Sequence, residues 1–359
     1  MLIFWLLLAV GLALLISGAD LLVRGAARLA VDFGVPTLVI GLTVVAFGTS
    51  APELAVSVKS AWSGQTELAI ANVVGSNIFN ILFILGLAAI IAPLAVSSQL
   101  IRRDVPLMIL VSAAAGLMTS DGSIDRREAI VLFAGLVIYS LLLFIQGRKQ
   151  GIKANNEEID PLINSKAPNW QNLTLIITGL TLLVLGARLL VNNAVLIASS
   201  FGISEAIIGL TIVSIGTSLP EAVTSVVATF KGQRDIAIGN VVGSNIFNIL
   251  CVLGISGIIS PEALQAGVQL QSLDIPVMLA AAVLCLPLFI TGASLNRLEG
   301  LVFLALYGVY LGYLITFTVA PAYLPTLQSI TLYGVAPFTV IFVASTLIYD
   351  MRQKTISSR

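Results

Sequence analysis

Histidine is absent from this chain, and charged residues are few. Without histidine, the chain lacks the commonest general base, the usual zinc ligand and the central member of a Ser-His-Asp triad. Only 10% of the 359 residues are charged, whereas soluble domains carry roughly 25%, so the chain cannot cover a surface that faces water. With 58% hydrophobic residues, the sequence instead indicates a protein that lies mostly in a lipid bilayer.

The chain also has no net charge and only two cysteines. The 18 Lys and Arg residues balance the 18 Asp and Glu residues, so no net basic charge points to a nucleic-acid partner. The two cysteines, Cys251 and Cys285, lie in separate apolar runs. We expect both to be buried free thiols rather than a disulfide or a metal site.

Long apolar runs dominate the rest of the sequence. A helix needs about 20 apolar residues to cross the hydrocarbon core, and we predict eleven such spans, at residues 2–23, 37–62, 67–93, 104–120, 128–146, 170–191, 204–230, 235–259, 274–291, 298–318 and 331–349. The third and eighth spans are interrupted by Gly and Asn, which predicts broken helices there. The predicted fold class is therefore an all-α polytopic membrane protein.

Basic residues are distributed unevenly between the ends of these spans. With the N-terminus outside and the C-terminus in the cytoplasm, fourteen of the eighteen Lys and Arg residues fall on the inner side, the exceptions being Lys59, Arg126, Arg127 and Arg188. Lys and Arg accumulate on the cytoplasmic side of membrane proteins, so this is the predicted orientation. The one substantial hydrophilic connection, residues 147–169, is then a cytoplasmic linker.

An internal repeat divides the chain. Residues 71–86 recur at 239–254 with thirteen of sixteen positions identical, and GTSAPE at 48–53 recurs as GTSLPE at 216–221, both at an offset of 168. Because an odd number of spans, five, separates the copies, the second enters the membrane from the opposite side, as in the inverted repeats of secondary transporters. We predict a five-helix repeat, the linker, an inverted five-helix repeat, and an extra transmembrane helix with a cytoplasmic tail, at 1–146, 147–169, 170–318 and 319–359.

Two of the eighteen acidic residues, Glu53 and Glu221, lie deep inside predicted spans. An ionisable group at the bilayer centre costs about 2.5–3.5 kcal/mol on insertion scales and marks a functional site by default. Asp20 lies near the end of the first span, four residues before Arg24, and is predicted to form an ion pair with it at the membrane interface.

Each of these glutamates follows a proline inside its span. Pro52 and Pro220 cannot donate to the carbonyl four residues earlier, and a carbonyl freed at this depth is tolerated only where something polar satisfies it. Four hydroxyl oxygens stand beside these carbonyls, on Thr49, Ser50, Thr217 and Ser218. Simple kinks with Ser/Thr hydrogen bonds are the alternative, but two symmetric kinks that each carry a glutamate favour a binding site.

The second repeated block adds further oxygen atoms. Ser76 and Asn80 are four residues apart and share a helical face, as do Ser244 and Asn248. All donors in the two blocks are oxygen, which suits a hard cation such as Ca²⁺ or Na⁺, and two carboxylates match the charge of one Ca²⁺. A site that cannot hold Ca²⁺ and Na⁺ at the same time exchanges one ion for the other.

Other polar and small residues of this block have a less definite role. Asn77 and Asn245 fall on a different helical face, where interhelical hydrogen bonds and contact with an ion are both open. Gly75 and Gly243 are predicted to allow close helix packing.

The paired motifs, GTSAPE and GTSLPE each followed by NVVGSNIFN, resemble the alpha-repeats of the calcium/cation antiporter superfamily, specifically its prokaryotic sodium/calcium exchanger branch. The resemblance covers roughly residues 1–318. It implies a ten-helix core with alternating access, in the plasma membrane of a prokaryote (the inner membrane), that exchanges Ca²⁺ for Na⁺ without a cofactor. It further implies cation ligands at Glu53, Glu221, Thr49, Ser50, Thr217, Ser218, Ser76, Ser244, Asn80 and Asn248, with backbone oxygens near Ala46 and Ser214.

The chain departs from this pattern at two points. Some relatives, including potassium-dependent exchangers, carry Asp in the second repeat where this chain carries Asn248, which argues against K⁺ co-transport. The eleventh span is the other departure.

Three other functions compete with Na⁺/Ca²⁺ exchange. A Ca²⁺/H⁺ exchanger needs only a glutamate that takes up a proton near neutral pH. An intramembrane hydrolase would lack both histidine and a pair of mid-span aspartates, and a cation channel would leave the paired inverted motifs unexplained. For the antiporter, we predict that the first and sixth spans, with Gly18, Gly25 and Gly186, slide against the rest to switch access.

Overall fold

Helices make up nearly all of the structure, a computed structural model that describes residues 2–151, 169–201 and 214–357. The first half consists of α1 (Leu2–Phe33), α2 (Thr37–Ile40), η1 (Gly41–Val45), α3 (Ala46–Thr49), α4 (Ala51–Trp62), α5 (Thr66–Ile78), η2 (Phe79–Leu85), α6 (Gly86–Ile91), β1 (Leu94–Ala95), η3 (Leu100–Asp104), α7 (Val105–Met118), η4 (Thr119–Asp121), β2 (Ser123–Ile124) and α8 (Arg126–Gly151). Of these, η1, η2 and η3 are π-helical and η4 is a 3₁₀ turn.

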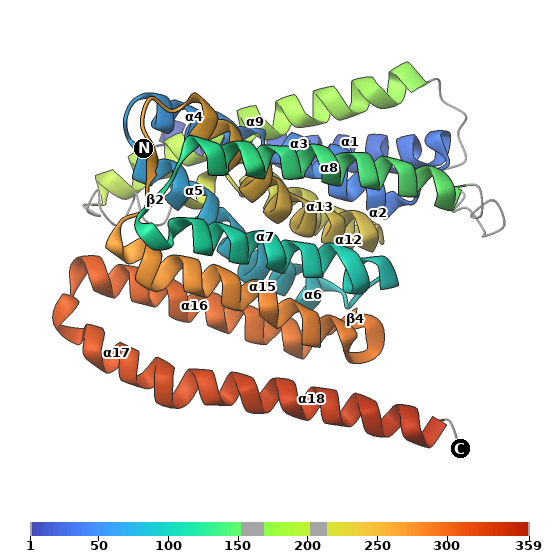
Figure 1. The fold of residues 1–359 in the computed structure, drawn as a ribbon. Helices are drawn as coiled ribbons and strands as arrows, with labels where there is room; N and C mark the ends of the chain where they lie inside the picture. The colour runs from blue at the N-terminus through green and yellow to red at the C-terminus, as the bar shows by residue number, and fades with distance from the viewer. Residues whose placement is uncertain (1, 152–168, 202–213, 358–359) are drawn as a thin grey trace.

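The second half repeats this order and adds a helix. It consists of α9 (Asn169–Ser200), α11 (Ser214–Gly216), α12 (Leu219–Phe230), α13 (Arg234–Phe247), η7 (Asn248–Leu253), α14 (Gly254–Ile259), β3 (Leu264–Gln265), η8 (Leu270–Asp274), α15 (Ile275–Ile290), η9 (Thr291–Ala293), β4 (Ser294–Leu295), α16 (Arg297–Val319), η10 (Pro321–Tyr323), α17 (Leu324–Ile330), η11 (Thr331–Val335) and α18 (Ala336–Ser357). Figure 1 shows these helices running side by side in one bundle.

Within the described residues, eight helices are long and apolar enough to cross a membrane, and the bent pair Thr37–Thr49 and Ala51–Trp62 makes a ninth. The chain is therefore an all-helical, multi-pass membrane protein. The two other predicted spans coincide with shorter elements. Span 104–120 is the 14-residue α7, and span 204–230 contains the 12-residue α12 and a segment, 202–213, outside the described residues.

The third and eighth spans are continuous helices, so the prediction that they are broken is wrong. Thr66–Ile91 and Arg234–Ile259 each run for 26 residues, with a π-helical segment in the middle. Neither stretch contains proline, so every backbone N–H can still donate along the helix. Asn80 and Asn248 lie in these π-helical segments, and Gly75 and Gly243 lie in the α-helices before them. The second span, which contains Pro52, bends by 46°.

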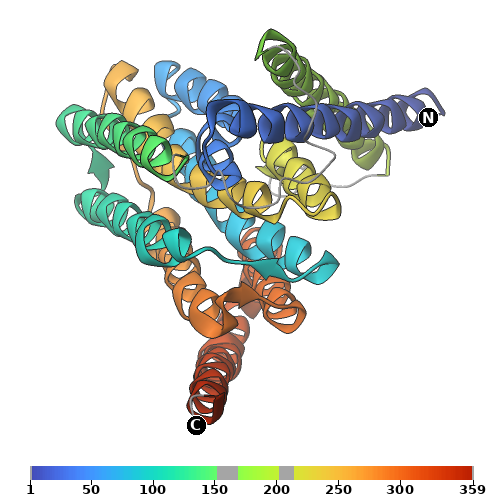
Figure 2. The ribbon, with the colours of Figure 1, turned by 90° about the vertical axis from the view of Figure 1, so that its right-hand side faces the viewer.

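Helices α1 and α9 pack backbone against backbone at one edge of the bundle, opposite α18 (Figure 2). A Cβ added to Gly18 would lie 2.7 Å from the carbonyl oxygen of Gly179, and one added to Gly186 would lie 2.8 Å from that of Gly11. Only glycine permits so close an approach, which is the usual way that membrane helices associate without a hydrophobic driving force.

Two short antiparallel pairs of strands join the two halves of the chain. Strand β1 pairs with β4, with Leu94 opposite Leu295, and β2 pairs with β3, with Ile124 opposite Leu264. All four of these residues are fully buried. Each pair therefore ties a loop of one half to a loop of the other.

The centre of the bundle is formed by α5 and α13, which bury most of their side chains. Cys251 and Cys285 are free and buried, which confirms that prediction. The close approach predicted for Gly243 is also present, because an added Cβ would lie 2.8 Å from the Cα of Leu42. No described atom lies within 4 Å of a Cβ added to Gly75, so the close approach predicted there is not seen among the described residues.

Candidate functional site

The two mid-span glutamates occupy equivalent places at the centre of the bundle. Glu53 is the third residue of α4 and Glu221 the third of α12, each after a helix break and a proline at the second position. Both side chains are completely buried, and neither pairs with a basic side chain among the described residues. Their place in the first turn of a helix puts each carboxylate near the positive end of a helix dipole.

Each glutamate accepts a hydrogen bond from a serine of the other repeat. Ser218 Oγ lies 2.8 Å from Glu53 Oε1, and Ser50 Oγ lies 2.9 Å from Glu221 Oε1. These serines are the residues at which the two helices break, with backbone angles of φ −80°, ψ 5° at Ser50 and φ −89°, ψ 7° at Ser218. The breaks thus bring the hydroxyl of one repeat onto the carboxylate of the other.

The serines of the second motif are not arranged symmetrically. Ser76 Oγ lies 3.5 Å from Glu53 Oε1 and 2.9 Å from Ser218 Oγ. Its counterpart Ser244 instead donates to the carbonyl oxygen of Ala46, at 3.5 Å. The same carbonyl lies 3.4 Å from Thr49 Oγ1, so the backbone oxygen of Ala46 lies beside this centre, and its role as a cation ligand stays a prediction. Ser214 begins α11, and its side chain lies outside the described residues.

Four buried oxygen atoms of this centre have no hydrogen-bond partner among the described residues. They come from two residues of each repeat, related by the offset of 168: Glu53 Oε2, Asn80 Oδ1, Glu221 Oε2 and Asn248 Oδ1. A buried acceptor without a donor costs about 1–3 kcal/mol, and more when it is charged. A cation that contacts these oxygens would remove this cost.

Asn77 and Asn245 form hydrogen bonds between helices, which is one of the two roles left open for them. Asn80 Nδ2 donates to Asn245 Oδ1 at 3.4 Å, and Asn248 Nδ2 donates to Asn77 Oδ1 at 3.1 Å. Asn77 Nδ2 also donates to the carbonyl oxygen of Asn245. These bonds hold Asn80 and Asn248 by their amide N–H groups, and no described donor reaches their amide oxygens.

Two further asparagines, Asn72 and Asn240, were not predicted as part of the site. Asn72 Nδ2 lies 3.3 Å from the carbonyl oxygen of Glu53 and 3.0 Å from Ser57 Oγ, and Asn72 Oδ1 accepts from Thr217 Oγ1 at 3.3 Å. The sequence did contain a signal for them. Asn72 precedes Ser76 by four residues and Asn80 by eight, so the three share a helical face.

The second copy of this arrangement has the same geometry. Asn240 Nδ2 lies 3.3 Å from the carbonyl oxygen of Glu221 and 3.0 Å from Ser225 Oγ, while Asn240 Oδ1 accepts from Thr49 Oγ1 at 3.0 Å. The threonine hydroxyls therefore bond to asparagines, and the asparagines hold the backbone of each glutamate against α5 and α13.

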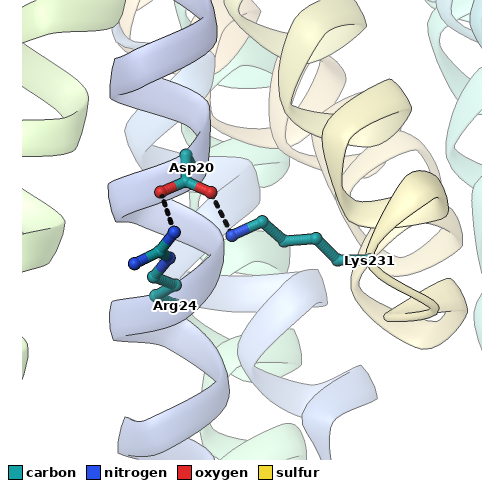
Figure 3. Close-up of polar contacts among 3 residues, drawn as sticks. All are labelled: Asp20, Arg24 and Lys231. Atoms are coloured by element: carbon teal, nitrogen blue, oxygen red, sulfur yellow. Dashed lines mark ion pairs between the residues drawn. The ribbon is translucent and has the colours of Figure 1, made fainter. Parts of the chain in front are cut away.

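Asp20 lies apart from this centre, in an ion pair. Its Oδ2 lies 2.9 Å from Arg24 Nη2, which confirms the predicted pair on one helix. The second oxygen of Asp20 pairs with Lys231, the residue that follows α12 (Figure 3). The ion pair therefore also joins α1 to α12.

The fold and its polar centre together define a class of protein. A polytopic helical bundle made of two related halves, with buried oxygen atoms where the halves meet, is typical of a membrane transporter for cations. No described group of three His, Cys, Asp or Glu side chains could hold a resident metal ion.

Comparison with known proteins identifies the family. The sodium/calcium exchanger protein family matches residues 3–145 and again residues 172–316. The chain is 41% identical over 288 residues to the inner membrane protein YrbG of Escherichia coli, covering 77% of this chain and 86% of that protein. It is 32% identical over 341 residues to the sodium/calcium exchanger MaX1 of Methanosarcina acetivorans, covering 86% and 97%.

A solved structure of a sodium-calcium exchanger also resembles this chain. The sodium-calcium exchanger NCX_Mj, soaked with Na⁺ and Sr²⁺, superposes with a TM-score of 0.74 at 32% identity, over 87% of this chain and 99% of that one. The chain belongs to the sodium/calcium exchanger family. It is a cation exchanger, not an enzyme.

Proposed function

We propose that this protein exchanges Ca²⁺ for Na⁺ across the membrane, with both cations bound in turn at the centre where Glu53 and Glu221 lie. The observation that carries the proposal is the set of four buried oxygens to which no described group donates a hydrogen bond, two of them on carboxylates. Two carboxylates balance one Ca²⁺, which takes 6–8 oxygen ligands in flexible geometry. The same oxygens can hold Na⁺ after Ca²⁺ has left.

The proposed ligands are those expected from the resemblance. Glu53, Glu221, Asn80 and Asn248 supply the unpartnered oxygens. Hydroxyl and backbone oxygens complete the sites, from Thr49, Ser50, Thr217, Ser218, Ser76, Ser244, Ala46 and Ser214. Because Asn248 is neutral, the site carries two negative charges, which supports transport without K⁺.

A flux measurement on purified protein in liposomes tests this proposal. Liposomes loaded with Na⁺ are expected to accumulate ⁴⁵Ca²⁺ when outside Na⁺ is low, and to stop when outside Na⁺ equals inside Na⁺. Varying pH and K⁺ independently separates the alternatives. Uptake that follows a pH gradient and ignores the Na⁺ gradient would establish the Ca²⁺/H⁺ exchanger instead.

We further propose that the protein lies in a prokaryotic inner membrane with its N-terminus outside and its C-terminus in the cytoplasm. The excess of Lys and Arg at one end of the spans supports this orientation, and the name of the relative YrbG places that protein in the inner membrane. The two matched stretches support a division into repeats at 1–146 and 170–318, joined by the linker 147–169.

Alternating access is proposed to arise from sliding of α1 and α9 together against the remaining helices. The glycine contacts that join α1 to α9 bring their backbones into contact, which supports movement as a unit. The strand pairs β1–β4 and β2–β3 connect loops that do not involve α1 or α9, so they hold the other helices together without restraining this pair.

Removing the side chain of Asn72 or Asn240 is expected to weaken Ca²⁺ binding. Asn240→Ala deletes the two bonds that Asn240 donates to Glu221 and Ser225. At about 1 kcal/mol for each net hydrogen bond, we expect the Kd for Ca²⁺ to rise by roughly tenfold or more, as measured by titration calorimetry. Gln171→Ala, which removes an exposed amide side chain on α9, is the control and is expected to leave the Kd unchanged.

Deleting the extra helix, residues 320–359, is expected to leave exchange intact. No side chain of α17 or η11 is buried, and the family match ends at residue 316. Loss of the contact from Gly292 N to Asp350 Oδ1 is expected to lower thermal stability only slightly. Flux per molecule within about twofold of the full chain would agree with this view, and loss of flux by a folded truncated protein would contradict it.

A further inference from the structure

A cavity of about 430 Å³ lies between α4 and the middle of α9, beside the glutamate centre. It is lined near that centre by Pro52 and Thr217, which are the neighbours in sequence of Glu53 and Ser218. At its other end it is lined by Lys59, Arg188 and Asn192. We call it the α4–α9 cavity. In the proposed orientation, this end faces the outside.

The charged residues that line the α4–α9 cavity are both basic. Lys59 and Arg188 are exposed, and no acidic residue is among the described residues that line the cavity. Neither basic residue takes part in an ion pair with a described residue. Lys59 lies six residues after Glu53 on α4, a rise of about 9 Å along the helix axis. A cation that enters by this route therefore passes two positive charges.

This charge is not a by-product of the internal repeat. At the offset of 168, Arg188 corresponds to Asp20 and Lys59 corresponds to Val227. The equivalent place at the other end of the bundle therefore holds an acidic residue, which pairs with Arg24 and Lys231 (Figure 3). The two ends of the protein differ in the sign of the charge at this one position.

We propose that Lys59 and Arg188 form a positively charged entrance that weakens the apparent affinity for Ca²⁺ at the outer face more than that for Na⁺. Coulomb repulsion is proportional to the charge of the entering ion, so a divalent cation is disfavoured twice as strongly, in free-energy terms, as a monovalent one. This entrance favours release of Ca²⁺ outside and entry of Na⁺ there. The inference rests on the proposed function and on the proposed orientation.

The effect is predicted to be moderate and dependent on salt. In water, one unit charge about 10 Å from a divalent cation changes its affinity by about two- to fourfold at low ionic strength. For Na⁺, the corresponding change is less than twofold. Screening becomes strong when the Debye length falls to about 8 Å, at roughly 0.15 M salt, so the effect is expected to shrink as ionic strength rises.

A cysteine at position 59 tests the sign of the charge without changing its position. Lys59→Cys, reconstituted in liposomes, is treated from outside with a cationic or an anionic methanethiosulfonate reagent, neither of which crosses the membrane. The native thiols of Cys251 and Cys285 are buried. Arg127→Cys is the matched control, because Arg127 is exposed on the same proposed side and does not line the cavity.

The KM for outside Ca²⁺ is expected to be roughly tenfold lower with the anionic adduct than with the cationic one, at low ionic strength. The unmodified cysteine is expected to lie between them, and Arg127→Cys to show no difference. An equal KM for both adducts, or an effect only when the reagents reach the opposite face, would overturn the inference. If untreated wild-type protein shows no Na⁺-driven Ca²⁺ uptake, the proposed function has failed instead.

Discussion

Replacing either central glutamate by glutamine is expected to abolish Ca²⁺ exchange, with at least a hundredfold loss of flux. Glu53→Gln and Glu221→Gln keep the volume of the side chain and leave an amide oxygen that can accept from Ser218 or Ser50. What each change removes is one of the two negative charges that balance Ca²⁺. Each also places an amide N–H₂ where one of the unpartnered oxygens lay. The partial positive charge of that group repels a cation.

The same variants are expected to be at least as stable as the wild type when no cation is bound. A buried carboxylate without a basic partner is costly to fold, and the amide avoids that cost. Ca²⁺ stabilises the wild type in proportion to its binding, so the rise in melting temperature on adding Ca²⁺ is expected to disappear in the variants. The melting curve with and without Ca²⁺ therefore separates a binding defect from a folding defect.

Glu299→Gln is the matched control for these variants. Glu299 is also buried, but it belongs to the capping box of α16, where its oxygens accept from Asn296 N and Thr291 Oγ1. Its replacement is expected to lower the melting temperature while leaving Ca²⁺-dependent stabilisation in place. Full exchange by folded Glu53→Gln protein would contradict the proposed role of the central pair.

Cross-linking α1 to α12 is expected to stop exchange reversibly. Asp20 and Lys231 contact each other across these helices, so cysteines at both positions are within reach of a short bifunctional thiol reagent that can be cleaved by reduction. If α1 slides against the bundle, the link fixes one access state and flux falls to background. Reduction is expected to restore it.

A second link on the same helix provides the control. Asn172 of α9 donates to Asp32 of α1, so cysteines at these two positions join helices that are proposed to move together. This link is expected to leave flux within about twofold of the unlinked protein. Full flux with α1 joined to α12, or complete loss with α1 joined to α9, would contradict sliding of the pair.

The sequence was informative about the centre of the molecule because strong local constraints operate there. Glutamate deep in an apolar span and proline inside a helix each allow few interpretations. Both features occur in each repeat, 168 residues apart. Glu53, Ser50, Glu221 and Ser218 accordingly lie together in the structure. Their role as cation ligands stays a prediction.

Other features could not be predicted because they depend on contacts between distant parts of the chain. Packing decides whether a run with Gly and Asn breaks or contains a π-helical segment. The third and eighth spans contain π-helical segments. The two-residue strands pair across 140 residues or more, with no alternating pattern long enough to be detected. Lys231 pairs with Asp20 only because α12 ends beside α1.

Anomalous X-ray diffraction from crystals grown with Sr²⁺ tests the central claim most directly, because it places the cation without assuming any mechanism. We predict one peak at about 2.3–2.6 Å from oxygen atoms of both Glu53 and Glu221, close to the amide oxygens of Asn80 and Asn248, and its loss when Na⁺ is raised. A peak that contacts neither glutamate, or one that persists unchanged in high Na⁺, would contradict exchange at this site.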